Sequence, residues 1–316
     1  MKVIDLINSS KSTAFSFEIL PPLKGNSIQK VYNVIDKLIE FDPKYINITS
    51  HHSEYIYKTL PDGSFQKVNI RKRPGSVAIA SAIQNKYGIP AVPHIICKGF
   101  TKDETEYALI DLNFLGVYDL LLLRGDVKTL EAGQKTDIYH EHATDLQQQV
   151  NDFNKGIAID GSVFEANETP FSYGMACYPE KHEEAPNMES DIFYLKEKVK
   201  NGADYLVTQM FFDNEKYYAF VDRCRAEGIT VPIIPGIKPI VFKNQLTVLP
   251  KIFRSDIPEP FATELRKCKT DDEAKAVGVE WCIQQCKDLI AHGVPSLHFY
   301  TMMASDSVYK VAKEVY

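Results

Sequence analysis

Hydrophobic and polar positions follow two alternating periods along this chain. Short runs rich in Val, Ile, Leu, Tyr and Phe are each followed by a longer stretch with the period of an amphipathic helix. This alternation is typical of parallel strands joined by helices, because a parallel crossover needs room for a helix. Eight runs are predicted as strands: 14–20, 45–49, 91–97, 119–123, 171–177, 204–208, 231–235 and 296–300.

A helix is expected after each predicted strand. The expected helix starts lie near Ser27, Gly75, Thr101, His142, Glu189, Asn214, Lys243 and Ser305. Thr101 and Glu104 form the T-x-x-E pattern of a capping box, and an extra helix over 271–292 precedes the last strand. Eight strand-and-helix repeats predict an α/β fold, a (β/α)8 barrel of the TIM type, with residues 1–316 as a single domain. A doubly wound sheet would need an arbitrary break into two halves.

Two irregular stretches interrupt the repeats. Residues 58–74 contain the turn sequence Pro61-Asp62-Gly63 and the basic Arg71-Lys72-Arg73. They predict an inserted loop or hairpin, which is either a lid or a decoration. Residues 156–170 separate a helix from a strand. Because no linker rich in Pro, Gly or Ser divides the chain, neither stretch predicts a domain boundary.

Composition and charge exclude several classes of protein. Lys and Arg number 36 against 42 Asp and Glu, so the net charge of −6 predicts neither a nucleic acid nor a membrane surface as partner. No signal peptide and no apolar run of the ~18 residues that span a bilayer is found, which predicts a cytoplasmic protein. The six cysteines include no C-x-x-C pair. Cys282 and Cys286, one helical turn apart, are therefore expected to be buried thiols rather than half of a metal site.

Polar residues follow the predicted strands, where the chemistry of such barrels takes place. Glu18 lies among apolar residues at the end of the first strand. Burial there would raise its pKa toward the range of a general acid, and a structural Glu in an ion pair is the alternative. Arg124-Gly125-Asp126 follows the fourth strand. Its glycine would allow close approach of backbone to a ligand and its charges would meet a phosphate or an electron-poor ring, although an ordinary turn has the same residues.

Other residues at the strand ends allow more than one role. His94 and His182 are each a base or a polar contact, and no metal site is expected because ligand spacings such as H-E-x-x-H are absent. The Gln209 amide is able to pair with the edge of a heterocycle or to cap the next helix. The absence of G-x-G-x-x-G and G-x-x-x-x-G-K-[ST] excludes nucleotide binding through a Rossmann turn or a P-loop, and the absence of G-x-S-x-G argues against a serine nucleophile.

The strand-end motifs, taken together and in order, resemble those of the methylenetetrahydrofolate reductase family. The resemblance covers roughly residues 14–303 and is closest to the catalytic domain in its short bacterial form. The matching residues are Phe17-Glu18 with Pro21-Pro22, Pro93-His94, Leu123-Arg124-Gly125-Asp126, Cys177-Tyr178-Pro179-Glu180 with His182, Asp191 with Lys198, Thr208-Gln209 with Phe211-Phe212-Asp213, Pro235-Gly236-Ile237 with Pro239, and His298-Phe299-Tyr300-Thr301. The family's fold is a flavin-binding β/α barrel, in agreement with the fold predicted above.

The resemblance implies a reductase of one-carbon metabolism and methionine biosynthesis. Its cofactor would be FAD, its electron donor NADH or NADPH, and its reaction the ping-pong reduction of 5,10-methylenetetrahydrofolate to 5-methyltetrahydrofolate. Glu18 matches the general acid and Asp126 the anion that stabilises an iminium ion. Cofactor-binding positions are Thr49, His94, Arg124, Gly125, Asp126, Ala143, Tyr178, His182, Asp191 and Lys198, and substrate-binding positions are Glu18, Gln209, Gln245 and Tyr300. Family members are commonly homo-oligomers.

The chain departs from the family pattern at several positions. Ser50-His51-His52 stands where Tyr-Gly-Ala is common, His142 replaces a tyrosine, and Leu249 replaces an aromatic residue that often contacts nicotinamide. Met302-Met303-Ala304 replaces a segment with an arginine that helps to hold folate, for which Arg71 or Arg73 is a candidate substitute. Because the sequence ends at Tyr316, no regulatory domain and no inhibition by S-adenosylmethionine through one are expected.

Two other functions stay open at this point. The departures at the nicotinamide and folate positions are compatible with a non-redox folate-binding barrel that transfers or removes methyl groups. Another flavin barrel, such as proline dehydrogenase, explains the fold but not the combination of Glu18, Asp126 and Gln209.

Overall fold

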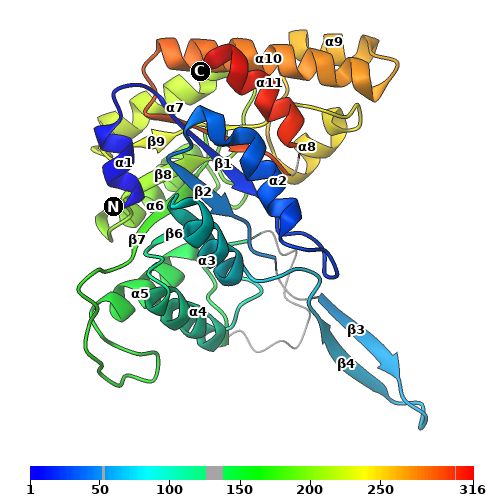
Figure 1. The fold of residues 1–316 in the computed structure, drawn as a ribbon. Coiled ribbons are helices and arrows are strands. Elements are labelled where there is room, and N and C mark those ends of the chain that lie inside the picture. Colours follow the sequence, from blue (N-terminus) through cyan, green and yellow to red (C-terminus); the bar gives the residue numbers. More distant parts are fainter. Residues whose placement is uncertain (52–53, 126–137, 303) are drawn as a thin grey trace.

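Parallel strands form a barrel in the computed structural model, which describes residues 1–51, 54–125, 138–302 and 304–316 (Figure 1). Nine described strands pair in the order β10-β11-β1-β2-β5-β6-β7-β8-β9, and all of these pairs are parallel. The strands are β1 (Ala14–Ile19), β2 (Tyr45–Ile48), β5 (Ala91–Ile96), β6 (Asp119–Leu123), β7 (Ser172–Cys177), β8 (Tyr205–Thr208), β9 (Ile233–Ile234), β10 (Gly236–Ile237) and β11 (Ser296–Tyr300). The predicted β/α barrel is confirmed.

Pro235, the last residue of the seventh predicted strand (231–235), separates β9 from β10, which lies just beyond the predicted strand. Proline has no amide hydrogen to give to a strand ladder, so the strand is interrupted at that residue. β9 pairs with β8, and β10 pairs with β11. The two halves together occupy the place of one strand and bring the two ends of the sheet next to each other.

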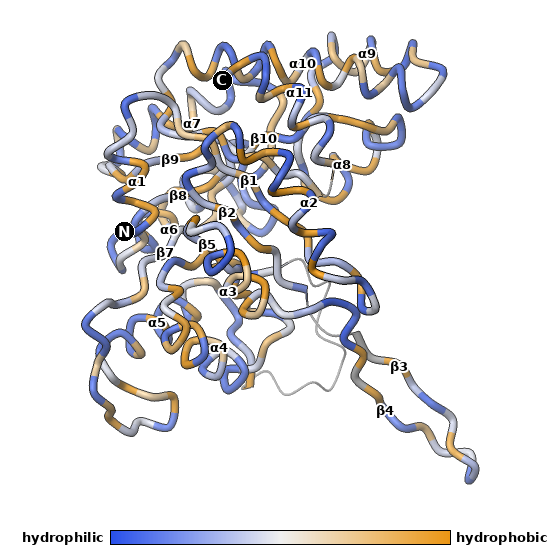
Figure 2. Tube along the Cα trace, in the orientation of Figure 1, coloured by the Kyte–Doolittle hydropathy of each residue, from blue (hydrophilic) through white to orange (hydrophobic). Residues whose placement is uncertain are grey.

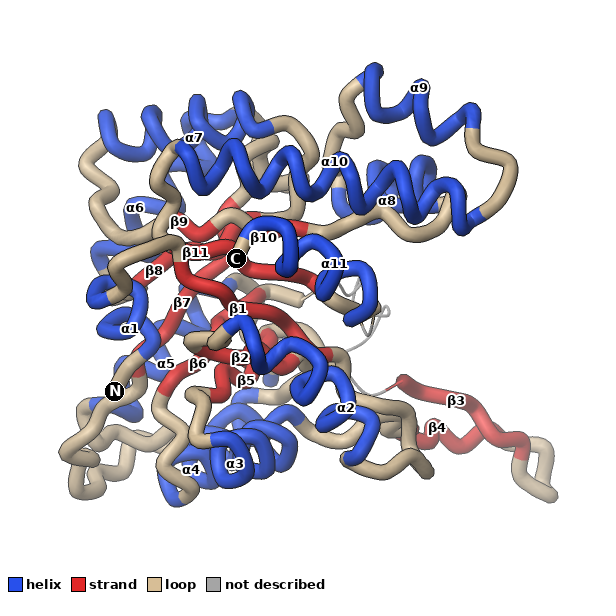
Figure 3. Tube along the Cα trace, turned by 45° about the horizontal axis from the view of Figure 1, so that its top comes forward, coloured by secondary structure: helices blue, strands red, loops and turns tan. Residues whose placement is uncertain are grey.

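Helices surround the strands on the outside (Figure 3). They are α2 (Gln29–Leu38), the short 3-10 helix η1 (Ile39–Phe41), α3 (Ser76–Tyr87), α4 (Lys102–Phe114), α5 (Ala143–Asn154), α6 (Met188–Lys200), α7 (Asn214–Ala226), α8 (Gln245–Phe253), α9 (Glu259–Lys267), α10 (Asp271–Ala291) and α11 (Ser305–Val315). Hydrophobic residues are interspersed with hydrophilic ones along these helices (Figure 2). The predicted capping box is present, since Thr101 accepts a hydrogen bond from the Glu104 amide and Glu104 from that of Thr101.

The helix α1 (Val3–Ser9) closes the end of the barrel where the strands begin. Neither α1 nor α9 is among the helices predicted from the sequence. The Val3 amide donates to Asp119 Oδ1 at 2.9 Å, and burial raises the pKa of Asp119 to about 6. Val3 and Ile7 pack against the interior side chains Tyr45 and Tyr205. This end of the barrel is therefore filled by side chains, and the opposite end is left for a site.

The insertion predicted near residues 58–74, a loop or a hairpin, is a hairpin. β3 (Glu54–Thr59) and β4 (Phe65–Ile70) are antiparallel and form a separate two-stranded sheet. The hairpin starts before the predicted insertion and extends away from the barrel (Figure 1). In its turn, Asp62 Oδ1 accepts hydrogen bonds from the amide and the hydroxyl of Ser64, at 2.9 and 2.7 Å.

The extra helix predicted before the last strand is α10. It packs directly against the chain that follows β10, since a Cβ on Gly278 would lie 2.0 Å from the carbonyl oxygen of Ile240. Cys282 and Cys286 are buried, as predicted. None of the helices in the described part of the chain is long and apolar enough to span a bilayer.

Candidate active site at the carboxyl ends of the strands

A cavity of about 340 Å³ opens at the ends of the strands opposite α1. Its lining comes from residues far apart in sequence, and it contains most of the predicted site residues: Glu18, Thr49, His94, Arg124, Gly125, Tyr178, His182, Gln209 and Tyr300. Strand ends of a barrel converge on one rim, which explains how these positions meet.

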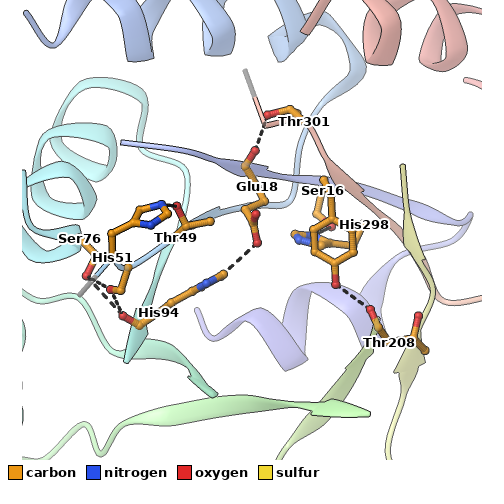
Figure 4. Close-up of polar contacts among 11 residues, drawn as sticks. Ser16, Glu18, Thr49, His51, Ser76, His94, Thr208, His298 and Thr301 are labelled. Atoms are coloured by element: carbon orange, nitrogen blue, oxygen red, sulfur yellow. Dashed lines mark hydrogen bonds and ion pairs between the residues drawn. The ribbon is translucent and has the colours of Figure 1, made fainter. Parts of the chain in front are cut away.

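Glu18 and His94 point toward each other in this cavity (Figure 4). Glu18 Oε2 lies 3.6 Å from His94 Nε2, and the two side chains are 12% and 5% exposed. Burial lowers the pKa of His94 to about 3, and repulsion from His298 and His51 acts in the same direction. The imidazole is therefore neutral near pH 7 and pairs with Glu18 as a polar group rather than as a cation.

Backbone and side-chain hydrogen bonds hold the ends of β1 and β11 together. Glu18 lies beside Tyr300 in the strand register. The Thr301 hydroxyl donates to the Glu18 carbonyl oxygen at 2.6 Å, and the Tyr300 hydroxyl donates to the Thr208 carbonyl oxygen at 2.6 Å. Gly236 makes the second bond possible, because a Cβ there would lie 2.3 Å from the Thr208 oxygen and 2.5 Å from the Tyr300 ring. The position of the Tyr300 ring thus depends on a glycine in β10.

Two buried polar groups below the rim were not predicted as site residues. His298 accepts or donates a hydrogen bond of 3.0 Å with the Ser16 hydroxyl, and burial lowers the pKa of His298 to about 3. Lys238 follows β10 and is 3% exposed. Burial lowers its pKa to about 8, and the charge of Glu18 opposes that change. In the sequence, His298 opens a segment that matches the family and Lys238 lies between the matched residues Ile237 and Pro239, which is the signal for both positions.

Serine and threonine side chains connect β2 to β5 at the rim. The Ser50 hydroxyl donates to the His94 carbonyl oxygen, and its oxygen lies 2.9 Å from the Ser76 hydroxyl oxygen. Thr49 Oγ1 lies 3.4 Å from His51 Nε2 (Figure 4). The departures from the family pattern at Ser50 and His51 therefore lie on the cavity itself.

Arg124 and Gly125 form the predicted turn after β6. Gly125 has a φ of +87°, which side chains rarely adopt. A Cβ there would lie 3.4 Å from Ile96 Cβ, so the backbone runs close to the wall of the cavity. Arg124 forms ion pairs with Glu183, at 3.3 Å, and with Glu184. The third residue of the motif, Asp126, lies outside the described residues.

A second group of predicted cofactor residues lies behind the cavity wall. Asp191 Oδ2 accepts a hydrogen bond of 2.8 Å from the His182 amide, and Lys198 Nζ donates to the Ala176 carbonyl oxygen at 3.0 Å. Burial lowers the pKa of Lys198, and Asp191 opposes this effect. Neither Asp191 nor Lys198 lines the cavity, and neither does Ala143, at the start of α5.

The two predicted glutamine contacts differ in placement. Gln209 lines the cavity, and its Oε1 accepts a hydrogen bond of 2.9 Å from the next amide, that of Met210. Gln245 begins α8 and does not line the cavity. Its Oε1 accepts hydrogen bonds from the Val241 and Phe242 amides, at 2.7 and 3.1 Å. In this arrangement the Gln245 side chain orders the start of a helix.

The fold and this cavity define a class of protein. A parallel β/α barrel with polar side chains gathered at the carboxyl ends of its strands is the architecture of a barrel enzyme. A model of the methylenetetrahydrofolate reductase family matches residues 2–316. The chain belongs to that family.

Known proteins resemble the chain at moderate sequence identity. A Caenorhabditis elegans protein described as a probable methylenetetrahydrofolate reductase (NADPH) is 30% identical over 315 residues, which cover 99% of this chain and 43% of that protein. The Escherichia coli 5,10-methylenetetrahydrofolate reductase is 30% identical over 297 residues, covering 94% of this chain and 88% of that protein. The chain therefore spans less than half of the nematode protein and most of the bacterial one.

A solved structure supports the fold alone. A protein from Clostridium thermocellum, described as binding two copies of 5-methyl-5,6,7,8-tetrahydrofolic acid, superposes with a TM-score of 0.55 at 15% sequence identity, and the match covers 99% of each chain.

Proposed function

We propose that this protein reduces 5,10-methylenetetrahydrofolate to 5-methyltetrahydrofolate with electrons from NADH or NADPH, through bound FAD in a ping-pong reaction. One observation carries the proposal. In a chain of this family, Glu18, Gln209 and Tyr300, which match folate positions, line the same cavity as Thr49, His94 and Arg124, which match flavin positions. Hydride transfer from the flavin to the folate requires that the two share one cavity.

The residues present fit a flavin. The Gly125 backbone borders the cavity, and the Arg124 guanidinium lies at the rim. His94 Nε2 is buried and has no hydrogen-bond partner among the described residues. These features suit a planar heterocycle with polar edges and a phosphate-bearing chain. A volume of about 340 Å³ is near the lower end for ligand sites, which suits the reacting rings rather than a whole dinucleotide.

The chemistry that bound FAD supplies is two-electron transfer, first from the nicotinamide and then to the folate. Thr49, His94, Arg124, Gly125, Tyr178 and His182 would hold the cofactor at the cavity, with Asp191 and Lys198 as supporting residues behind it. Arg124 would meet the charge of a phosphate.

Glu18 would carry the proton of the folate half-reaction. Opening the five-membered ring of methylenetetrahydrofolate to the reactive iminium needs a proton on the nitrogen that leaves. The Glu18 carboxyl is 12% exposed and faces a neutral imidazole rather than a His cation. A carboxyl at this position would supply the proton to a folate bound in the cavity.

Gln209 and Tyr300 would orient the pterin. An amide offers both a donor and an acceptor, which suits the edge of a pterin ring, and the Tyr300 ring is fixed by its bond to Thr208. Asp126, outside the described residues, would stabilise the iminium as an anion.

Stopped-flow spectroscopy on the full chain loaded with FAD tests the proposal. We expect NADH or NADPH to bleach the flavin absorbance and methylenetetrahydrofolate to restore it. Protein that binds no FAD, or whose flavin absorbance responds to neither substrate, would refute the reductase.

One observation favours a second candidate, a non-redox folate-binding barrel. Leu249, at a position where the family often has an aromatic contact to nicotinamide, is 3% exposed and packs with Phe212 and Phe261 in a hydrophobic cluster. A protein that binds folate but whose flavin, if any, is not reduced by nicotinamide would support this candidate.

A further inference from the structure

Arg254 is a cation at the cavity to which the predicted motifs assign no role. It follows α8 and lines the same cavity as Arg124. Its Nε lies 3.6 Å from Glu183 Oε2, while Glu183 Oε1 accepts a hydrogen bond of 3.3 Å from Arg124 Nη2. A single carboxylate therefore joins two guanidinium groups at the rim. A carboxylate therefore fits between the two guanidinium groups, at the rim of the cavity.

The backbone of Arg254 is held in a conformation that most side chains avoid. Its φ is +58°, at a helix end where glycine is the usual residue. The two residues after Arg254 are held in place: the Ser255 hydroxyl donates to the Met210 carbonyl oxygen at 2.6 Å, and the Asp256 amide donates to Glu180 at 2.9 Å. Glycine at residue 254 would avoid the backbone strain, yet the residue is a long cation, and the turn directs it to the cavity.

Arg254 is the most available of the Lys and Arg side chains among the described lining residues. Lys181 donates to two backbone carbonyl oxygens, at 2.9 and 2.5 Å. Arg124 forms ion pairs with both Glu183 and Glu184, and its side chain is 17% exposed. Arg254 forms an ion pair with Glu183, and these side chains are 62% and 47% exposed. Because an exposed ion pair of this kind contributes little to stability, a ligand carboxylate is able to replace Glu183 as the partner of Arg254.

The wall beside Arg254 is apolar. Ile252 and Phe253, which directly precede Arg254, line the cavity, as does Met302 after β11, and Ile252 and Met302 are 55% and 48% exposed. An apolar surface that ends at a guanidinium complements an aromatic ring followed by carboxylates. The folate of the proposed reaction has this order, a p-aminobenzoyl ring followed by a glutamate with two carboxylates.

We propose that Arg254 recognises the glutamate carboxylates of the folate substrate, at the place that Glu183 occupies in the structure, while Ile252, Phe253 and Met302 contact the p-aminobenzoyl ring. This inference rests on the proposed function and adds a specificity-determining residue to it. Arg254 makes the protein prefer a folate over a pteroate, which has the same rings but lacks the glutamate.

Titration calorimetry with the full chain loaded with FAD tests this inference. The two ligands are 5-methyltetrahydrofolate and 5-methyltetrahydropteroate, and the variants are Arg254→Gly, Arg254→Lys and the control Lys251→Ala on the exposed side of α8. For Arg254→Gly we expect about tenfold weaker folate binding and unchanged pteroate binding, since one charge-assisted contact is lost. Arg254→Lys should recover part of the loss, and Lys251→Ala should change neither affinity.

A second measurement separates binding from folding. Glycine suits the backbone of residue 254, so Arg254→Gly should unfold at the same temperature as the unaltered protein or higher. Folate affinity that is unchanged in Arg254→Gly, or an equal loss for both ligands, would overturn the inference. Weaker flavin reduction by NADH with unchanged folate affinity would also overturn it, because the cation would then serve the dinucleotide phosphates. If the unaltered protein binds no folate at all, the proposed function itself fails.

Discussion

Glu18 Oε2 lies 3.6 Å from His94 Nε2, although the two residues come from strands that are not neighbours. β2 lies between β1 and β5 in the sheet, so the two side chains meet across the barrel interior. In barrels of this type, side chains from alternate strands share a layer. The layer that contains Glu18 and His94 forms the floor of the cavity, and burial keeps the imidazole neutral.

Glu18→Gln should separate the two half-reactions. The amide keeps the shape of the side chain but carries no acidic proton, so folate reduction should fall by a factor of ~100 or more. Flavin reduction by NADH needs no proton from Glu18 and should stay within about twofold. Stopped-flow absorbance measures both rates in one preparation.

The control for this variant is Glu165→Gln, an exposed carboxylate far from Glu18 in sequence. It should leave both half-reactions unchanged. An equal loss of rate in the two half-reactions of Glu18→Gln would assign Glu18 a structural role instead.

Gly236→Ala should disturb the site more than Tyr300→Phe. The added Cβ would lie 2.3 Å from the Thr208 carbonyl oxygen, a backbone atom, and 2.5 Å from the Tyr300 ring. One of the strands or the ring must move, which should lower the free energy of unfolding by ~2–4 kcal/mol. Tyr300→Phe removes only the hydrogen bond to Thr208 and should cost about 1 kcal/mol.

Urea denaturation measures both changes in stability, and Gly25→Ala is the control in open space. Gly25 has a positive φ, so the stability lost in Gly25→Ala reflects backbone strain without a clash. A Gly236→Ala protein no less stable than Gly25→Ala would show that the packing around Gly236 is looser than these distances imply.

The sequence predicted the elements whose periodicity is strong and missed those that depend on contacts between distant residues. The barrel strands are short apolar runs, helices such as α2 and α11 have a clear period of hydrophobic residues, and the order of elements then favours a barrel. α1 has only seven residues, and its partners are distant in sequence: the Val3 amide donates a hydrogen bond to Asp119, and Val3 and Ile7 pack against Tyr45 and Tyr205. No local pattern predicts such a helix.

The candidate site likewise contains residues that the sequence predicted and one that it did not. Glu18, Gln209 and Tyr300 lie at or just after strand ends. Strand ends of a barrel meet at one rim, so this rule and the family motifs together predicted that the three residues share a site. Arg254 lies after a helix, at a turn fixed by hydrogen bonds to Met210 and Glu180, and no motif contains it. Its place at the cavity follows only from the three-dimensional contacts of that turn.

The two buried histidines should make the fold sensitive to acid. Burial lowers the pKa of His94 and of His298 to about 3, whereas an unfolded histidine titrates near 6.5. Between about pH 6.5 and pH 3 the unfolded chain binds more protons, so stability falls as pH falls through that window. The expected slope is up to ~1.4 kcal/mol per pH unit for each histidine.

Denaturation of His298→Asn between pH 7 and pH 4 measures this effect. The variant should show a shallower pH dependence than the unaltered protein, while His142→Asn, at an exposed helix start, should retain the full slope. Identical slopes in His298→Asn and the unaltered protein would mean that His298 takes up a proton in the folded state.

Lys238→Met should stabilise the protein near pH 7 and lose much of that advantage in alkali. Burial lowers the pKa of Lys238 from 10.5 to about 8, and Glu18 opposes the change. Below about pH 8 the folded protein holds a buried charge, at a cost of up to ~3 kcal/mol by the size of the shift. Between about pH 8 and pH 10.5 the unfolded chain binds the extra proton, so the stability of the unaltered protein rises with pH.

Denaturation at pH 7 and pH 10.5 should therefore show that the gap, the difference in stability between Lys238→Met and the unaltered protein, shrinks as pH rises. Exposed Lys251→Met is the control. Glu18→Gln should widen the gap at pH 7, because it removes a carboxylate that stabilises the Lys238 cation. A gap that does not change with pH would place the Lys238 charge in water.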